Sequence, residues 1–279
     1  MPSRMPPSLD RTVHPPTKRW LFRPRPEAHA IDLLMASLGI NTTLATLLVQ
    51  KGITNFDQAK AYFRPSLDAL HDPFLMHDMD KAVDRLLHAI MRQEPILVYG
   101  DYDVDGVTAV SMMYSFLRSL QAKVAFYIPD RHKEGYGISL QAVEWAANAG
   151  FKLIVSLDCG VRAINEIQRA NALGIDVIVS DHHEPASVLP HAYAMLNPKQ
   201  KDCRYPTQEL SGCGVGFKLL QALVLKKRLP MAQLYDYLDL VAVSIACDIV
   251  PIVDENRILA YHGLKKLNST PRLGLFSFF

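Results

Sequence analysis

The chain is organised around Ile96-Leu-Val-Tyr-Gly-Asp-Tyr-Asp-Val-Asp-Gly106, an apolar run followed by three aspartates that alternate with single residues. Residues 108–120 then show the apolar spacing of a helix with few charges. This order predicts a strand, an acidic turn and a helix. Two carboxylates about 4 Å apart repel by roughly 4 kcal/mol at an effective dielectric near 20, so three at one strand end indicate a cation site.

The acidic cluster has two other possible interpretations. An EF-hand loop also begins D-x-D-x-D-G, but its twelfth position is a bidentate Glu, and counting from Asp101 places Met112 there. The EF-hand interpretation fails on that count. A solvated acidic turn without a role stays open, because Asp is common in turns for local hydrogen-bonding reasons.

Strand and helix patterns alternate beyond residue 93. Apolar strand-like runs cover 96–99, 124–128, 153–157 and 177–179, and helical spacing covers 108–120, 139–149 and 163–173. Alternation of this kind predicts an α/β fold with a parallel sheet flanked by helices on both faces. Ligands bind such sheets at the carboxyl ends of the strands, so the residues after each apolar run are the candidate site.

Metal-ligand side chains follow several of these runs. Asp158 follows one strand, Asp181, His182 and His183 follow another, and the apolar run 240–247 ends in Asp248. We expect these apolar segments to deliver carboxylates and imidazoles to one sheet edge together with the first cluster. Such ligands without thiolate favour Mn²⁺ or Mg²⁺, and their number favours two ions. The reaction class implied is phosphoester or phosphoanhydride hydrolysis.

Composition agrees with a cytoplasmic enzyme. The 279 residues are 49% hydrophobic, enough for one large domain and a smaller one. No apolar stretch approaches the roughly 20 residues of a membrane span, and the N-terminus lacks a signal-peptide core. The four cysteines show no C-x-x-C pairing, which argues against a zinc site and a disulfide framework. The net charge of +2 does not by itself indicate a nucleic-acid partner.

The expected organisation has four parts. Residues 1–30 form a basic, proline-rich arm that is either solvated or in contact with phosphates. Residues 31–92 form a helical region, and residues 93–268 form the sheet domain. Residues 269–279 form an apolar tail that we expect to be truncated.

Four segments resemble the motifs of the DHH phosphoesterase superfamily in order and spacing: Asp-Tyr-Asp-Val-Asp-Gly at 101–106, Leu-Asp-Cys-Gly at 157–160, Ser-Asp-His-His at 180–183 and Cys-Asp-Ile-Val-Pro at 247–251. Flanking segments at 63–67, 71–76, 134–137, 210–218 and 256–257 resemble, within it, the bacterial exonucleases specific for single-stranded DNA. The resemblance runs over about residues 18–275.

The resemblance implies a role for each ligand. Asp103 holds the first ion, Asp105 the second, and Asp158 bridges both; His182 and Asp248 complete the second site, with Asp101 as a further ligand or a supporting group. Metal-bound water is then the nucleophile. Some superfamily members carry a His four residues before the middle aspartate, where this chain has Tyr99, so the first site is expected to be weaker or to rely on Asp101.

Substrate contacts are expected beside the ions. His183 is expected to touch the scissile phosphate, or else to orient its motif. By resemblance, Arg131 binds the 5′-terminal phosphate with its two-pronged guanidinium. The stretch 211–216 has Ser211, Gly212 and Gly214, whose N–H groups would approach a phosphate next to a helix starting near residue 217; a plain tight turn is equally compatible with the pattern.

The resemblance further implies a 5′-to-3′ exonuclease that acts on single-stranded DNA with a 5′ end in repair and recombination. Single-strand-binding proteins or helicases are the expected partners, and no membrane is involved. Members of this group also carry a second domain of the DHHA1 type and an oligonucleotide-binding barrel, neither of which we find here. Two alternatives therefore stay open: a phosphoesterase for short oligonucleotides, nucleotides or pyrophosphate, and a catalytically silent fragment that binds metal or DNA.

Overall fold

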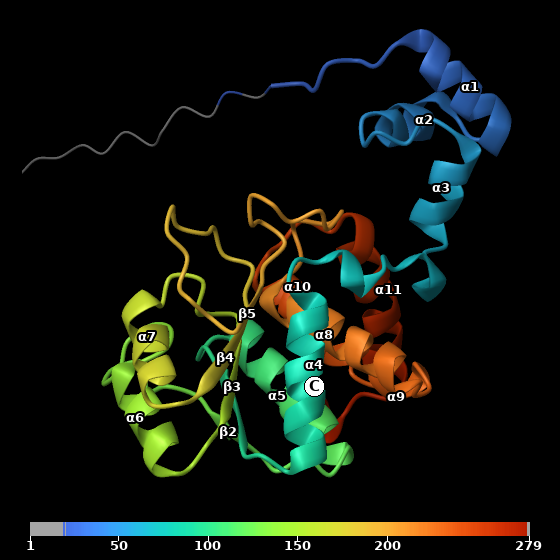
Figure 1. Cartoon of the computed structure of the whole chain (residues 1–279). Coiled ribbons are helices and arrows are strands. Elements are labelled where there is room, and N and C mark those ends of the chain that lie inside the picture. The colour runs from blue at the N-terminus through green and yellow to red at the C-terminus, as the bar shows by residue number, and fades with distance from the viewer. Residues whose placement is uncertain (1–18, 20, 278–279) are drawn as a thin grey trace, which may run out of the picture. The chain divides into compact units, whose positions relative to one another are not determined.

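A five-stranded parallel sheet with the order β2-β1-β3-β4-β5 forms the centre of the larger of two units in the computed structural model (Figure 1). Its strands are β1 (Ile96–Gly100), β2 (Val124–Tyr127), β3 (Leu153–Leu157), β4 (Asp176–Ser180) and β5 (Ala194–Leu196). The structure describes residues 19 and 21–277, and the larger unit begins at Pro65. Strands β1 and β3 are buried along their whole length, which explains their continuous apolar sequence.

Helices cover both faces of the sheet. One face packs against α6 (Leu140–Asn148) and α7 (Ile164–Ala172), and the other packs against α4 (Met79–Arg92), α5 (Val104–Ser119) and α8 (Gly212–Lys227) (Figure 1). The predicted α/β fold, a parallel sheet flanked by helices on both faces, is confirmed. The short strand β5 was not predicted, because it has only three residues.

A further group of helices lies outside α5 and α8. It contains α9 (Ala232–Tyr235), α10 (Leu238–Cys247), α11 (Asp254–Ser269) and the short α12 (Leu273–Phe276). The apolar run 240–247, expected to reach the sheet edge as its strands do, is helix α10. It packs against α5, α8 and α11, so most of its surface is buried and its apolar residues show no clear period.

A buried ion pair connects α8 and α11 with the segment that precedes α4. That segment contains the 3₁₀ turns η1 (Leu67–Ala69) and η2 (Pro73–Leu75). Lys218 Nζ on α8 donates to Glu255 Oε1 on α11 at 2.9 Å and to the carbonyl of His71 at 2.7 Å. Tyr205 also donates to Glu255. The side chains of Lys218 and Glu255 are both fully buried. Each charge therefore depends on the other for compensation.

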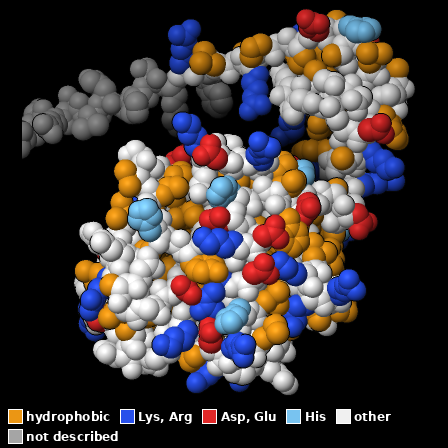
Figure 2. Space-filling view, viewed as in Figure 1, with side chains coloured by type: hydrophobic (Ala, Val, Ile, Leu, Met, Phe, Trp, Pro, Cys, Tyr) orange, Lys and Arg blue, Asp and Glu red, His pale blue; other side chains and the backbone are white. Residues whose placement is uncertain are grey.

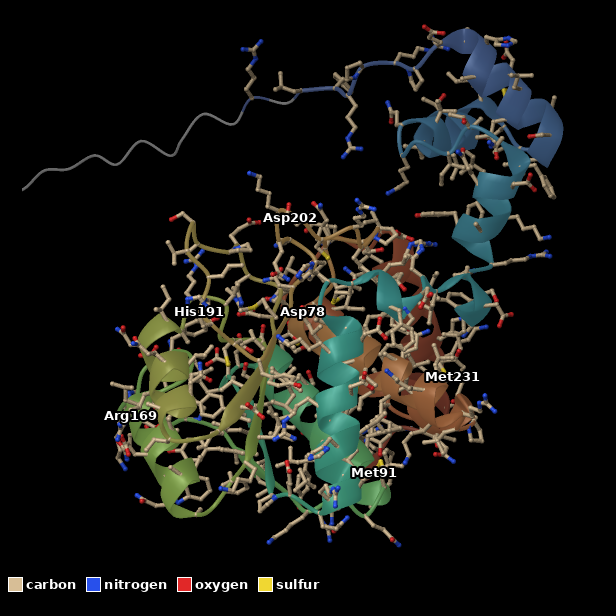
Figure 3. All side chains as sticks on the ribbon, viewed as in Figure 1. Asp78, Met91, Arg169, His191, Asp202 and Met231 are labelled. Atoms are coloured by element: carbon tan, nitrogen blue, oxygen red, sulfur yellow. The ribbon has the colours of Figure 1, made fainter. Side chains whose placement is uncertain are left out.

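The N-terminus of α4 is tied to the sheet. Asp78 precedes the helix in a left-handed conformation, and its Oδ2 accepts a hydrogen bond from the amide of Met195 on β5 at 3.0 Å (Figure 3). Helix α4 thus belongs to the sheet unit, and the boundary between units lies at Arg64 and Pro65 instead of near residue 92.

The smaller unit contains α1 (Ala28–Leu38), α2 (Thr42–Val49) and α3 (Phe56–Phe63) around a core of Ile31, Leu34, Ala45, Leu48, Ile53 and Ala59. Asn41 and Asn55 cap α2 and α3 by accepting backbone hydrogen bonds. Most of the predicted basic arm, residues 1–18 and 20, lies outside the described residues.

No single helix in the described part of the chain is long and apolar enough to cross a membrane; α1 and α2 reach that length and composition only when counted together as a bent pair.

Candidate metal centre

The strand register brings three acidic strand ends to one level. Gly100 pairs with Leu157, and Leu157 pairs with Ser180, so the residues that follow, Asp101, Asp158 and Asp181, are neighbours at the carboxyl edge. From β1 the chain continues to β2 on one side of the sheet, and from β3 it continues to β4 on the other side. The direction of the connections therefore reverses between β1 and β3. Ligand sites of open parallel sheets lie at such a switch point.

The first acidic cluster occupies the turn from β1 into α5. Asp103 caps the helix, and its Oδ1 accepts from the amide of Gly106 at 2.9 Å. Asp105 lies in the first helical turn. Gly106 is required by packing, because a Cβ there would meet the backbone nitrogen and carbonyl carbon of Asp101 at 2.7 Å. The predicted order of strand, acidic turn and helix is confirmed, with the helix beginning at Val104.

Asp158 follows β3 in a strained backbone conformation. Its φ is +59°, in the left-handed region that non-glycine residues seldom adopt. The side chain is nevertheless almost completely buried, at the centre of the acidic group. Strain of this kind is often found where a side chain must point into a functional site.

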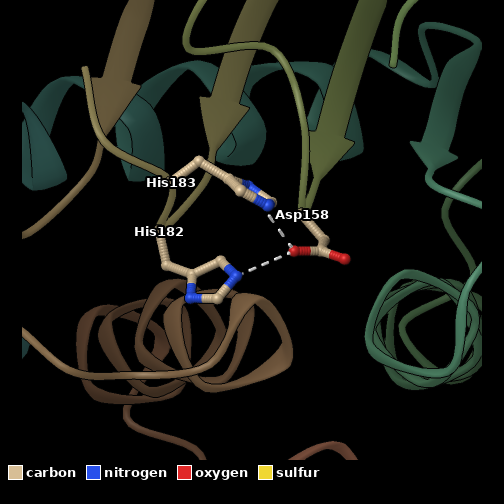
Figure 4. A group of neighbouring side chains, drawn as sticks. All are labelled: Asp158, His182 and His183. Atoms are coloured by element: carbon tan, nitrogen blue, oxygen red, sulfur yellow. Dashed lines mark ion pairs between the residues drawn. The ribbon is translucent and has the colours of Figure 1, made fainter. Parts of the chain in front are cut away.

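Two histidines follow β4 and face Asp158 (Figure 4). Nε2 of His182 lies 3.1 Å from Asp158 Oδ1, and Nδ1 of His183 lies 4.0 Å from the same oxygen. His183 is oriented by Asp181, whose Oδ1 lies 2.7 Å from its Nδ1. Asp181 is itself fixed, because its Oδ2 accepts from the amide of Val161 at 2.9 Å.

The remaining candidate ligand comes from a helix. Asp248 is the C-terminal cap of α10, and its Oδ2 lies 3.6 Å from His182 Nε2. The same nitrogen lies 3.7 Å from Asp105 Oδ2. Thus Asp248 lies beside the other candidate ligands, although it comes from a helix of the outer group and not from a strand end.

The side chains form three overlapping sets whose ligand atoms lie within 4.8 Å of one another. These sets are Asp101, Asp103 and Asp158; Asp105, His182 and Asp248; and Asp158, His182 and His183. In the described part of the chain, both carboxylate oxygens of Asp101, Oδ1 of Asp158 and Nε2 of His182 are buried without a hydrogen bond, and the last two lie 3.1 Å from each other. Buried polar atoms rarely lack partners, so these convergent atoms fit divalent cations with oxygen and imidazole ligands.

The electrostatics of the site also favour a cation. Burial, followed by the nearby Asp105 carboxylate, raises the pKa of Asp158 to about 10. Burial likewise raises the pKa values of Asp101 and Asp105. These groups ionise together at neutral pH only when positive charge offsets their repulsion. By contrast, the hydrogen bond to Asp181 raises the pKa of His183, which favours the imidazolium.

Helix α8 holds Asp105 in place through its first turn. Asp105 accepts hydrogen bonds from the amides of Gly212 at 2.6 Å and Cys213 at 2.7 Å, and from Ser244 Oγ on α10 at 2.8 Å. Ser211 caps the helix by accepting from the amide of Gly214 at 3.1 Å. Helix α8 therefore begins at Gly212, earlier than the predicted start near residue 217.

These contacts correct the expectation that the amides of 211–216 approach a phosphate. The amides of Gly212 and Gly214 already donate to side chains of the chain itself, and Ser211 is fully buried. Gly212 instead allows close packing, because a Cβ there would lie 2.5 Å from Asp158 Oδ1.

An aromatic row runs from the metal centre to Arg131. The Arg131 guanidinium lies 5.3 Å from the centre of the Tyr102 ring, and the Tyr102 and Tyr136 rings pack edge to face at 6.5 Å. The Tyr136 hydroxyl lies 3.1 Å from His183 Nε2. Arg131 and Tyr136 are exposed, so both are accessible beside the site.

Tyr99, at the position where some superfamily members carry a ligand histidine, lies in the core. Its ring stacks on that of Tyr127 at 5.5 Å, and its hydroxyl donates to the carbonyl of Gly137 at 2.8 Å. The side chain is buried in the core between the sheet and helices α6 and α7.

Two supporting residues were not assigned by sequence reasoning. The sequence shows Asp181 only as part of an acidic and histidine motif, and its position directly before two histidines is the signal that could identify its role. Ser244 lies one helical turn before Asp248. That relation was hidden because the segment was not expected to be a helix.

Comparisons with known proteins point to one family. The DHH family, N-terminal domain, matches residues 95–245. The single-stranded-DNA-specific exonuclease RecJ of Bacillus subtilis is 44% identical over 92% of this chain and 32% of that protein. RecJ of Escherichia coli is 36% identical over 68% of this chain and 35% of that protein. The crystal structure of RecJ in complex with Mn²⁺ from Thermus thermophilus matches with a TM-score of 0.77 and 27% identity, over 91% of this chain and 35% of that one. The chain thus spans about a third of the length of these relatives.

Proposed function

The chain belongs to the DHH family, and on that premise we propose that it is the catalytic core of a metal-dependent exonuclease that hydrolyses single-stranded DNA from its 5′ end. The observation that carries the proposal is the convergence of buried side-chain atoms of Asp101, Asp158 and His182 that lack hydrogen bonds at the carboxyl edge of the sheet, beside the β1/β3 switch point. The names of the similar proteins support the choice of single-stranded DNA as substrate.

Two Mn²⁺ or Mg²⁺ ions are assigned to the site. Asp101, Asp103 and Asp158 would hold the first ion, and Asp105, His182 and Asp248 would hold the second, with Asp158 available to both. The grouping of these side chains within 4.8 Å supports the assignment. When bound, two such ions lower the pKa of a water molecule and offset negative charge on the phosphoryl oxygens.

The chain's own residues then bind and orient the substrate. His183 presents an imidazolium that Asp181 orients, and the positive charge is directed at the scissile phosphate. Arg131 is the candidate for the 5′-terminal phosphate, because a guanidinium donates two parallel hydrogen bonds to such a group. The rings of Tyr102 and Tyr136 lie between these two positions and supply a surface on which a base can stack.

The mixture of positive and negative side chains on the surface agrees with a substrate that is bound through only a few nucleotides. On the face shown in Figure 2, the Lys and Arg side chains of the larger unit are interspersed with Asp and Glu. A narrow site that holds a few nucleotides needs no broad basic surface. The proposal includes action in the cytoplasm, in DNA repair and recombination, with single-strand-binding proteins or helicases as partners.

The test is a substrate panel with the purified chain and Mn²⁺. Single-stranded DNA with a 5′ phosphate is compared with the same strand carrying a 5′ hydroxyl, with duplex DNA, with a dinucleotide and with pyrophosphate. We expect mononucleotides from the single strand only, with a preference for the 5′ phosphate that Arg131→Gln reduces. Asp158→Ala, which removes the shared ligand, should abolish turnover.

Other outcomes identify the alternatives. Cleavage of the dinucleotide or of pyrophosphate alone would replace the exonuclease with a small-substrate phosphoesterase. No turnover with intact Mn²⁺ binding would identify a catalytically silent fragment. Full activity in Asp158→Ala would contradict the two-ion site itself.

A further inference from the structure

An apolar groove lies in the smaller unit, in the part formed by α1 to α3. It encloses about 680 Å³ and is lined by Leu38, Ile40, Leu44, Leu47, Phe56 and Phe63, among others. Four of these large side chains are roughly half exposed: 49% for Leu44, 52% for Leu47, 53% for Phe56 and 57% for Phe63. The volume lies within the range of about 300–1,000 Å³ typical of binding pockets, and soluble proteins rarely expose such clustered apolar side chains without a use.

The charged residues along the groove have one sign. Lys51, Lys60 and Arg64 line it, and no acidic residue does so among those the structure describes. None of the three forms an ion pair with another residue that the structure describes, and all three are exposed. A second hollow, which shares Leu47 with the groove, adds Arg23 and Arg25 to the same region.

We propose that this groove binds an acidic amphipathic helix of a partner protein. Apolar side chains spaced at i, i+3 or i+4, and i+7 on one helix face fill a groove of this kind, as in other helix-in-groove complexes. Asp and Glu residues that flank this face would meet Lys51, Lys60 and Arg64. That match of charge sets the choice of partner and speeds association.

Other occupants fit the groove less well. A second copy of the chain docked through the same face would bring Lys51, Lys60 and Arg64 against their own counterparts, and like charges would repel. Single-stranded DNA prefers flat aromatic platforms, whereas aliphatic side chains such as Leu38, Leu44 and Leu47 form much of this groove. A flat bilayer surface cannot fill a concave groove.

The test measures binding of a designed peptide to the full chain by fluorescence anisotropy. The probe is a fluorescein-labelled helix of about fifteen residues, with Leu at i, i+4 and i+7 and Glu on the flanking positions. We expect saturable binding, at least about tenfold weaker for Lys51→Glu combined with Lys60→Glu and for Leu47→Ser. Replacing the Glu residues of the peptide by Lys should have a similar effect.

Matched variants serve as controls. Leu33→Ser removes a leucine that is 53% exposed on α1 but lies outside the groove, and Lys123→Glu with Lys201→Glu makes the same charge change in the larger unit. Both should bind like the unchanged chain, and circular dichroism should show the same helix content in every variant. Asp158→Ala should also bind normally, which separates this interaction from the nuclease activity.

Several results would overturn the proposal. These are absence of saturable binding, equal binding of the Lys-bearing peptide, and unchanged binding by the groove variants. Light scattering that shows a dimer disrupted by Leu47→Ser would assign the groove to a second copy. Loss of oligonucleotide or anionic-vesicle binding in the groove variants, without peptide binding, would assign it to nucleic acid or to lipid.

Discussion

Replacing Gly212 by alanine should displace side chains of the candidate metal centre. An added Cβ would lie 2.5 Å from Asp158 Oδ1 and 2.6 Å from Asp158 Cβ, distances that real atoms do not tolerate. The Gly212 amide also donates to Asp105 at 2.6 Å. The substitution must therefore move either Asp158 or the start of α8, and each movement displaces a proposed ligand.

The size of the effect follows from two opposed contributions. Forcing a methyl group into a packed site costs about 1–3 kcal/mol, while alanine in place of glycine in a helix gains up to about 1 kcal/mol. A net loss of about 1–2 kcal/mol lowers the melting temperature by about 2–8 °C for a chain of this size. A displacement of about 1 Å in a catalytic group costs on the order of a hundredfold in rate.

Gly214→Ala is the matched control, two residues further along the same helix. A Cβ there would meet Ser211 Oγ at 3.3 Å and Leu210 side-chain atoms at 3.5 Å, contacts that small shifts can relieve. We expect its stability to be unchanged or slightly raised. Thermal unfolding without metal, Mn²⁺ titration calorimetry and nucleotide release should be measured on both variants. If Gly212→Ala matched Gly214→Ala in all three, the close packing of α8 on Asp158 would be refuted.

Three further predictions concern protons and buried charge. Because the metal-free pKa of Asp158 is raised from 3.8 to about 10, the folded state loses stability as pH rises between these values. Mn²⁺ binding should therefore release protons and become tighter as pH rises. Calorimetry in buffers of different ionisation enthalpy tests this, and a pH-independent affinity would contradict it. Asp181→Asn should lower the pKa of His183, so the falling limb of the pH–rate profile should move to lower pH. Turnover should slow about tenfold or more, while Mn²⁺ affinity should change little. An unchanged profile would show that the charge on His183 is not used. Lys218→Met leaves Glu255 buried without its cation and should lower the free energy of unfolding, measured in urea, by about 3–5 kcal/mol. Adding Glu255→Gln should recover part of this loss. A loss below about 1 kcal/mol would show that the pair contributes little.

Sequence reasoning brought together the acidic half of the candidate site because its signal is local. Asp101, Asp103, Asp105 and Asp158 each directly follow an apolar strand or begin the next helix, and parallel strands bring such positions to one edge. Strand ends could be predicted within one or two residues for the same reason: a change from apolar to polar residues marks them. These features depend little on the rest of the fold.

The supporting contacts could not be predicted because they join segments far apart in the chain. The bonds from Gly212 and Ser244 to Asp105 depend on how α8 and α10 pack, and no local pattern encodes that packing. Helix α10 itself was missed because a short segment that is buried on most sides is apolar throughout, as a buried strand is. The glycines of α8 were assigned to a phosphate for a related reason: glycine permits close approach but does not specify which group approaches.

Because Asp248 lies at the end of α10, metal binding should stabilise the larger unit. The other candidate ligands lie at strand ends or at the start of α5, so an ion held jointly with Asp248 would act as a reversible cross-link between the sheet edge and the outer helices. At a free ion concentration a hundredfold above its dissociation constant, such a link adds about 2.7 kcal/mol to the free energy of unfolding. Chelation would remove that contribution and free the C-terminal end of α10 to open, so the lifetime of the folded chain would follow the supply of its metal.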